Sequence, residues 1–184
     1  MSNTPLETTR LILRQFMPDD WQDLLEIARS KEASPYAYAD FTWPTDEAWA
    51  KESADYMATD SDMWAMARKE DGKVICFINC NRMNDTGYMD VGHVMNMAYA
   101  GNGYEEEGLG ALYQHLFDTT DAVGIIAGWA LEDEEKIAPL LSIGMQIAEQ
   151  GNGEAFDGSK RSFVHCILKL TKEEWEQKKK AECI

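Results

Sequence analysis

The stretch of chain between residues 88 and 116 changes its apolar pattern at two glycines, and this change constrains the fold more than any other feature. Residues 88–98 form an apolar run of strand length, and the apolar residues after Gly103 recur at the period of a helix. A strand that ends in glycines and opens a helix exposes unpaired N–H groups at the positive end of the helix dipole. The pattern therefore predicts an α/β chain with an anion-binding loop. The amides of that loop belong to Asn102, Gly103, Tyr104 and Glu105.

The first half of the sequence predicts a strand followed by two helices. Residues 11–13 are apolar, and residues 21–28 carry apolar side chains at helical spacing. A second helix is predicted to follow Thr45, a residue type suited to the N-cap. One face of this helix is expected to consist of Trp49, Ser53, Tyr56 and Met57.

The remaining elements alternate between strands and helices. Residues 63–68 and 74–81 flank an Asp-Gly pair, which favours an antiparallel hairpin. Residues 122–129 read as a buried strand, followed by a helix that stops at Gly144, so we expect a βαβ crossover. Residues 163–170 form the last predicted strand, and Thr171 with Glu174 forms a capping box that opens a terminal helix. Since no linker divides the sequence, residues 1–184 are predicted to form a single domain.

The charge and composition narrow the functional classes. Hydrophobic residues make up 45% of the chain, but no apolar run approaches the roughly 20 residues that span a bilayer. The amino terminus lacks the pattern of a secretory signal, so a cytoplasmic location is expected. A net charge of −16 disfavours nucleic acid and anionic membranes and attracts a cationic amine, although solubility or a salt-tolerant host is the preferred explanation of this charge.

The four cysteines predict neither a disulfide framework nor a metal site. They show no CxxC pair and no nearby histidine at ligand spacing. Cys76 and Cys80 are an even number of residues apart in a predicted strand, which puts them on one face. We expect both to be reduced thiols that pack in the core.

Four segments carry a resemblance to a known family. Residues 8–16 (TTRLILRQF) with residues 18–21 resemble an opening strand and helix, and residues 90–93 (DVGH) resemble a strand with a Glu-Ile-Gly-Tyr pattern. Residues 101–104 (GNGY) and 143–145 (IGM) resemble a glycine loop and a Leu-Gly-Phe turn. In this order the segments are similar to the GNAT superfamily of N-acetyltransferases, in the branch of the ribosomal-protein alanine N-acetyltransferases.

The resemblance implies a fold and a cofactor. It implies an α/β (α+β) architecture with a mixed, splayed sheet of six or seven strands flanked by helices. Acetyl-CoA would lie in the splay as co-substrate, opposite a small-molecule or peptide amine. The residues expected to bind it are Met95, Met97, Gly101, Asn102, Gly103, Tyr104, Glu105 and Asp133.

This sequence also departs from the family pattern at several positions. The phosphate motif Gln/Arg-x-x-Gly-x-Gly/Ala reads AGNGYE here, so its first and last positions differ. Residues 105–107 are three glutamates in the first helical turn, where they stabilise the dipole but repel a diphosphate. Asp133 and Lys136 replace the Asn and Ser of the next signature, and Leu140 replaces a tyrosine proton donor.

Two residues are candidates for the catalytic base. Acetyl transfer to an amine requires removal of a proton from the nucleophile. Asp90 occupies the place of the family's strand glutamate and is the first candidate, acting directly or through a water; the alternative is a solvated surface residue. His93 is the second, because imidazole titrates near neutral pH, although a lone histidine is more often a packing residue.

The function predicted from the sequence is transfer of acetyl from acetyl-CoA to a primary amine. The acceptor classes considered are a peptide N-terminus, an amino acid and a small polyamine-like molecule. The alternative is a GNAT-fold binding or interaction module with weakened catalysis, which the changes at Glu105 and Leu140 favour. A homodimer formed through an exposed strand or the terminal helix is a further alternative.

Overall fold

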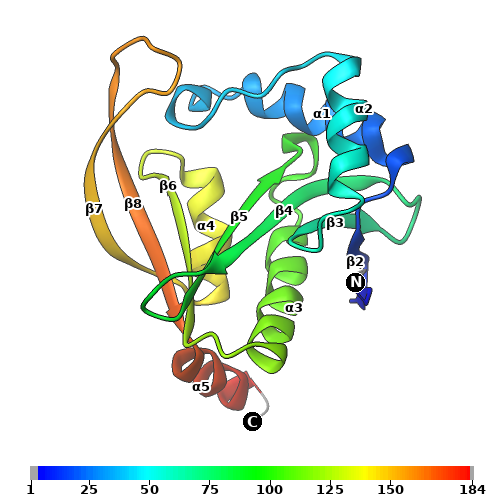
Figure 1. Cartoon of the computed structure of the whole chain (residues 1–184). Helices are drawn as coiled ribbons and strands as arrows, with labels where there is room; N and C mark the ends of the chain where they lie inside the picture. Colours follow the sequence, from blue (N-terminus) through cyan, green and yellow to red (C-terminus); the bar gives the residue numbers. More distant parts are fainter. Residues whose placement is uncertain (1–3, 183–184) are drawn as a thin grey trace.

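The computed structural model describes residues 4–182 as an open sheet with helices on both faces (Figure 1). The strands are β1 (Leu6–Glu7), β2 (Leu11–Gln15), β3 (Met63–Arg68), β4 (Val74–Met83), β5 (Tyr88–Met95), β6 (Gly124–Ala130), β7 (Gln146–Glu154) and β8 (Ser162–Thr171). The helices are α1 (Trp21–Glu32), α2 (Glu47–Met57), α3 (Tyr104–Thr119), α4 (Glu134–Ile143) and α5 (Lys172–Glu182). Short 3₁₀ turns lie at Pro18–Asp20, Ala37–Ala39 and Met97–Tyr99.

The sheet is mixed and splits in its middle. Its strand order is β1-β2-β3-β4-β5-β6-β8-β7, and the pairing is antiparallel except between β5 and β6. These two parallel strands pair only from Tyr88 to Asp90 against Gly124 to Ile126. Beyond Asp90 and Ile126 they diverge, which Figure 1 shows as the opening between the green and yellow-green strands.

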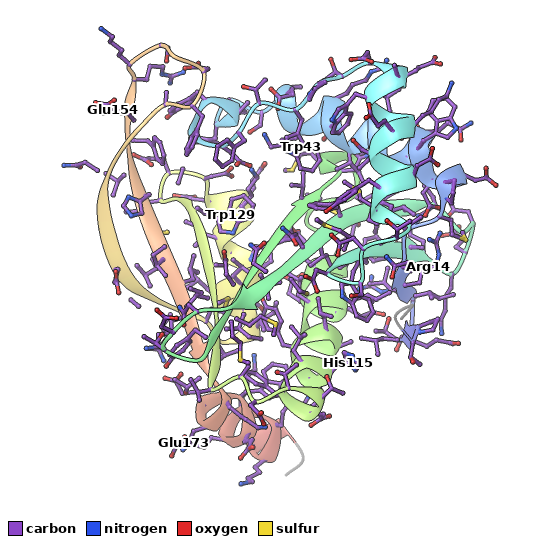
Figure 2. All side chains as sticks on the ribbon, viewed as in Figure 1. Arg14, Trp43, His115, Trp129, Glu154 and Glu173 are labelled. Carbon is purple, nitrogen blue, oxygen red and sulfur yellow. The ribbon has the colours of Figure 1, made fainter. Side chains whose placement is uncertain are left out.

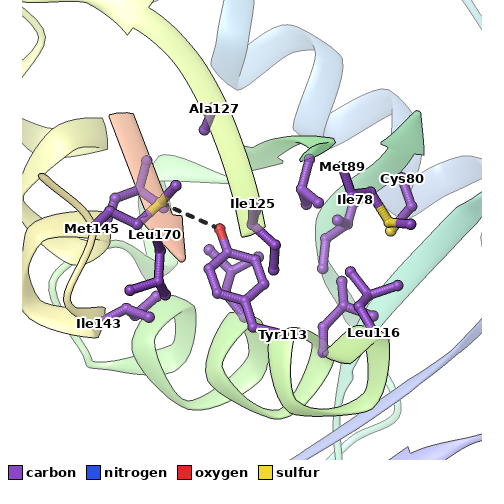
Figure 3. Close-up of a cluster of buried hydrophobic side chains, with 14 of the residues drawn as sticks. Ile78, Cys80, Met89, Tyr113, Leu116, Ile125, Ala127, Ile143, Met145 and Leu170 are labelled. Atoms are coloured by element: carbon purple, nitrogen blue, oxygen red, sulfur yellow. Dashed lines mark hydrogen bonds between the residues drawn. The ribbon is translucent and has the colours of Figure 1, made fainter. Parts of the chain in front are cut away.

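Two apolar cores hold the helices against the sheet. The larger core lies between the sheet and α3, α4 and α5, and includes Tyr113 and Leu140. Figure 3 shows its centre, where the Tyr113 hydroxyl lies 3.7 Å from the sulfur of Met145. The smaller core lies on the other face, under α1 and α2. Cys76 and Cys80 are both buried in the larger core, as predicted.

The predicted fold class is confirmed, with one strand more than the predicted range. Two strands were not located from the sequence: β1, which is only two residues long, and β7, whose residues Gln146–Glu154 are mostly polar and exposed and therefore carry no alternating apolar signal. The strand predicted for residues 88–98 ends at Met95, and a 3₁₀ turn occupies Met97–Tyr99. Helix α3 begins at Tyr104, directly after the glycine loop, as expected.

The helix ends follow local hydrogen-bonding chemistry. The predicted cap of α2 is wrong by one residue, because the side chain of Asp46, not Thr45, accepts from the amide of Trp49. Tyr56 is exposed and does not share the buried face of that helix. The capping box of α5 is confirmed: Glu174 accepts from the Thr171 amide at 2.8 Å, and the Thr171 hydroxyl accepts from the Glu174 amide at 3.2 Å.

Within residues 4–182, no helix combines the length and the apolar character needed to cross a bilayer.

Candidate active site

A cavity of about 690 Å³ lies where β5 and β6 diverge. Asp90 is the last residue of β5 that pairs with β6, so it lies at the apex of the splay, and Gly92 and His93 line the cavity beyond it. Gly128 and Trp129 line it from β6. Strand β4, the segment between α1 and α2, and the β7–β8 hairpin supply the remaining walls. We call this space the splay cavity.

The glycine loop turns its carbonyls towards one arginine. Gly101 and Gly103 both have φ of +72°, a left-handed conformation that other residues rarely adopt. Arg10 donates to the carbonyls of Asn102 (2.8 Å) and Gly103 (3.0 Å). In a trans peptide the N–H points opposite to the C=O, so the amides of Gly103 and Tyr104 point away from Arg10. No side chain caps α3 at Gly103, which leaves its first amides able to bind an anion.

The carboxylate of Glu107 binds Arg10, so it is not an unpaired charge beside the glycine loop. Its carboxylate accepts from Arg10 Nε at 2.6 Å, from the Arg10 amide at 2.7 Å and from the Thr8 hydroxyl at 2.6 Å. Burial raises the pKa of Glu107, but the hydrogen bonds from Thr8 and Arg10 outweigh it and hold the pKa below its ordinary value. The carboxylate is therefore part of the support of the loop.

Glu105 points inward from the first turn of α3 and meets His93. Its Oε1 lies 3.2 Å from His93 Nε2, and the two residues are only 4% and 2% exposed. The other ring nitrogen, Nδ1 of His93, is buried without a hydrogen-bond partner among the described residues, as is Nε1 of Trp129. The two rings lie edge to face with centroids 5.3 Å apart. Both residues line the splay cavity, and each carries a buried polar atom without a partner.

Asp90 lines the same cavity in a polar setting. It accepts a hydrogen bond of 3.0 Å from the side-chain amide of Asn81 on β4. Asp90 and Gly92 share one face of β5, and His93 lies on the opposite face, because side chains alternate along a strand. Both predicted catalytic residues reach the same cavity because the strands part there.

None of the eight predicted cofactor residues lines the splay cavity itself. Met95 is buried in the larger core, and the amide of Met97 donates to the hydroxyl of Ser30 on α1. Asp133 is buried at the start of α4, with an oxygen 3.6 Å from the ammonium of Lys136. The loop residues from Gly101 to Glu105 adjoin the cavity only through the contact between Glu105 and His93.

The position at which the family pattern has a tyrosine proton donor carries no proton donor in this structure. Leu140 is fully buried in the core. Tyr113 lies in the same core with its hydroxyl against Met145, and burial raises its pKa well above the ordinary value. Neither residue lines the splay cavity.

Sequence reasoning missed the roles of Arg10 and Trp129. Arg10 lies in the segment 8–16 that carried the family resemblance, but its partners are Asn102, Gly103 and Glu107, about ninety residues away. Trp129 ends an apolar run and was interpreted as part of a buried strand. Only the divergence of β5 and β6 brings its ring to the cavity.

A mixed sheet that splays between two parallel strands, with a glycine loop at the start of the following helix, defines the GNAT fold class. Comparison of the sequence with protein families agrees: the Acetyltransferase (GNAT) domain family matches residues 10–146. The chain therefore belongs to the GNAT acetyltransferase family, whose members use acetyl-CoA. No curated protein matches the sequence significantly.

Solved structures show the same fold at low sequence identity. A GNAT-family acetyltransferase from Bacillus anthracis is 16% identical with a TM-score of 0.79, covering 92% of this chain and 99% of its own. The ribosomal-protein-S5-alanine acetyltransferase from Vibrio fischeri is 13% identical with a TM-score of 0.72, covering 94% and 99%. The ribosomal L7/L12 alpha-N-protein acetyltransferase RimL, in complex with coenzyme A, is 11% identical with a TM-score of 0.75, covering 91% and 98%. The similar structures thus include the branch that the sequence resembles.

Proposed function

We propose that this protein transfers the acetyl group of acetyl-CoA to a primary amine. The observation that carries the proposal is the splay cavity, which brings two candidate bases, Asp90 and His93, to the divergence of β5 and β6. This cavity adjoins the uncapped amino terminus of α3 through the contact between His93 and Glu105. Acyl transfer from a donor that carries phosphates requires an anion site next to a cavity that contains a base. The amino terminus of α3 and the splay cavity provide these two features.

The residues of the loop fit the diphosphate of acetyl-CoA. Arg10 donates hydrogen bonds to the carbonyl oxygens of Asn102 and Gly103, so the opposite side of the loop presents N–H groups. Glu105 does not compete there, because its carboxylate lies under the helix against His93. When bound, acetyl-CoA supplies the acetyl group as a thioester. The remaining chemistry belongs to residues of this chain.

The cavity residues would hold the amine and remove its proton. The amine nitrogen, once neutral, forms the amide bond as the carbon–sulfur bond breaks, and the departing sulfur becomes the thiol of CoA after it gains a proton. Asp90 is the first candidate to accept the proton of the amine, directly or through a water, because it lies at the apex of the splay. His93 is the second, since its Nδ1 is unpartnered. Trp129 Nε1 is a donor that suits the carbonyl oxygen on which negative charge develops.

Calorimetric titration with acetyl-CoA tests this proposal. Submillimolar binding, followed by release of CoA when a primary amine is added, supports an enzyme. The variant Gly103→Ala provides a local test, because a left-handed φ of +72° strains any side chain there and should weaken binding. Gly158→Ala, at φ +75° in the β7–β8 turn, carries the same strain away from the loop and should leave binding unchanged.

A GNAT-fold binding module is the second candidate. The specific observation in its favour is the burial of Leu140 in the core, where the family pattern has a tyrosine proton donor. A module of this kind would bind a ligand in the splay cavity without turnover. Absence of acetyl-CoA binding, or binding without release of CoA across a panel of amines, would favour it.

A further inference from the structure

The chemistry of the splay cavity defines the kind of amine that it suits. We infer that the acceptor is a small aliphatic amine with at least two positive charges, held between carboxylates and aromatic rings. This inference rests on the proposed function for its catalytic step, but its binding step stands on the cavity alone.

The cavity walls carry negative charge. Asp40, on the segment between α1 and α2, and Asp90, on β5, line it, and exposed Glu154 lies at its β7 edge. Among the lining residues that the structure describes, none is Lys or Arg. A cavity lined by one sign of charge concentrates ligands of the opposite sign, and the net charge of −16 acts in the same direction.

Cations behind the walls do not neutralise these carboxylates. The ammonium of Lys31 lies 3.6 Å from Asp40 but also 3.1 Å from Glu32, so one cation is shared between two carboxylates. The ammonium of Lys136 lies 3.6 Å from Asp133. Lys31 alone therefore does not balance Glu32 and Asp40, and the guanidinium of Arg161 lies over the ring of Tyr38 in the same segment, 3.7 Å from its centroid.

Aromatic rings form most of the apolar lining. The lining rings are Phe41, Trp43, Phe77, Trp129, Phe156 and Phe163. Trp43 packs edge to face on Phe77, with centroids 5.4 Å apart, on the β4 and β5 side of the gap, and Trp129 lies on the β6 side (Figure 2). Rings of this kind attract ammonium groups and also cover the methylene chain that joins two of them. The lining therefore suits an aliphatic chain with charged ends.

The unpartnered nitrogen of His93 points to an N–H donor as the ligand. A carboxylate only accepts hydrogen bonds, so in the contact with Glu105 it is His93 Nε2 that donates. In the neutral ring Nδ1 is then an acceptor, and it is buried without a partner. An amine or ammonium group supplies the N–H that this atom lacks. This is independent of the charge of the walls.

The size of the cavity favours a small acceptor. The amide of Phe156, just after β7, donates to the carbonyl of Tyr38 at 2.8 Å, which joins the hairpin to the segment between α1 and α2. The rings of Phe41 and Phe156 pack across this junction at a tilt of 55°, with centroids 4.6 Å apart. A volume of about 690 Å³ falls in the usual range of small-molecule sites. The junction thus joins two of the elements that wall the cavity.

Calorimetric titration with 1,4-diaminobutane and n-butylamine tests the inference without acetyl-CoA. The two probes have the same carbon chain and differ by one charge. We expect the diamine to bind at least about 10-fold more tightly than the monoamine, which is about 1.4 kcal/mol. Asp40→Asn, which keeps an oxygen for the Phe41 amide, should weaken diamine binding about five-fold and change monoamine binding less. The titrations are repeated with CoA present, so that amine binding is also measured when CoA is bound beside the cavity.

A matched control separates the local carboxylate from the overall charge. Asp121→Asn makes the same charge change at an exposed aspartate between α3 and β6, away from the cavity, and should leave diamine binding unchanged. Equal affinity for the two probes, no binding of either with or without CoA, or an equal loss in the Asp40 and Asp121 variants would overturn the inference. If the diamine binds as expected but neither it nor any other primary amine is acetylated, the proposed function fails and the binding step of the inference stands. If n-butylamine is acetylated as efficiently as the diamine, the inference fails and the function stands.

Discussion

His93 and Glu105 join β5 to the first turn of α3 through a buried contact of 3.2 Å between Nε2 and Oε1. The glutamate occupies the loop position where the family pattern has Gly or Ala, and the sequence alone suggested that it would repel a phosphate. Its inward direction gives it a different role. It fixes the orientation of the histidine ring that lines the splay cavity.

We expect Glu105→Ala to lower the free energy of unfolding by about 1–3 kcal/mol, because His93 Nε2 would be buried without a partner. Glu105→Gln should cost less, since its amide oxygen still accepts from Nε2. Urea denaturation of the two variants measures the difference. Equal stability of Glu105→Ala and the unaltered protein would show that the contact contributes nothing to folding.

From the sequence, the glutamates at 105–107 are all expected to repel a diphosphate, but their contacts in the structure assign different effects to the three positions. Glu106 lacks the inward contacts of Glu105 and Glu107, so Glu106→Gln should tighten CoA binding about two-fold at low salt, an effect that fades as the Debye length falls to about 8 Å. Glu107→Gln should weaken binding, because it releases Arg10 from the loop. Calorimetry at two salt concentrations checks both directions. Identical affinities for all three proteins would mean that neither carboxylate influences the diphosphate.

The contribution of Glu107 to stability depends on pH in a defined direction. Its pKa is held below the ordinary value of 4.5, so the folded state favours the carboxylate. The stabilisation is fully present above pH 4.5 and is lost as the pH falls through the lower pKa of the folded state. The stability difference between Glu107→Gln and the unaltered protein should therefore be largest near neutral pH and shrink in acid. Thermal unfolding from pH 7 to pH 3 measures it, and a difference that grows in acid would contradict the assignment.

The sequence predicted most of the fold because the signals are local. The switch of apolar period at Gly103 and the capping box at Thr171 each depend on a few neighbouring residues. Strand β7 was missed because its polar residues pair only at an exposed edge beside β8. The contacts of Arg10 and the pairing of His93 with Glu105 could not be predicted, because they depend on how β2 and α3 are placed after folding. No spacing in the sequence records that placement.

Asp90 lies at the apex of the splay and is therefore the first candidate to test as the catalytic base. Asp90→Asn should lower kcat by roughly 10²-fold and leave acetyl-CoA affinity nearly unchanged, as expected for loss of a general base. The amide keeps an oxygen for the hydrogen bond from Asn81, so the change removes mainly the charge.

His93→Ala is the comparison, with thermal unfolding used to show that both variants are folded. A larger loss of kcat in the histidine variant would transfer the role to His93 Nδ1, because imidazole is a side chain suited to general-base catalysis near neutral pH. If neither change alters the rate with an amine that the unaltered protein acetylates, then both residues only shape the cavity. Rate enhancement would in that case come from positioning of the amine against the thioester, and Trp129 Nε1 would become the polar atom to test next.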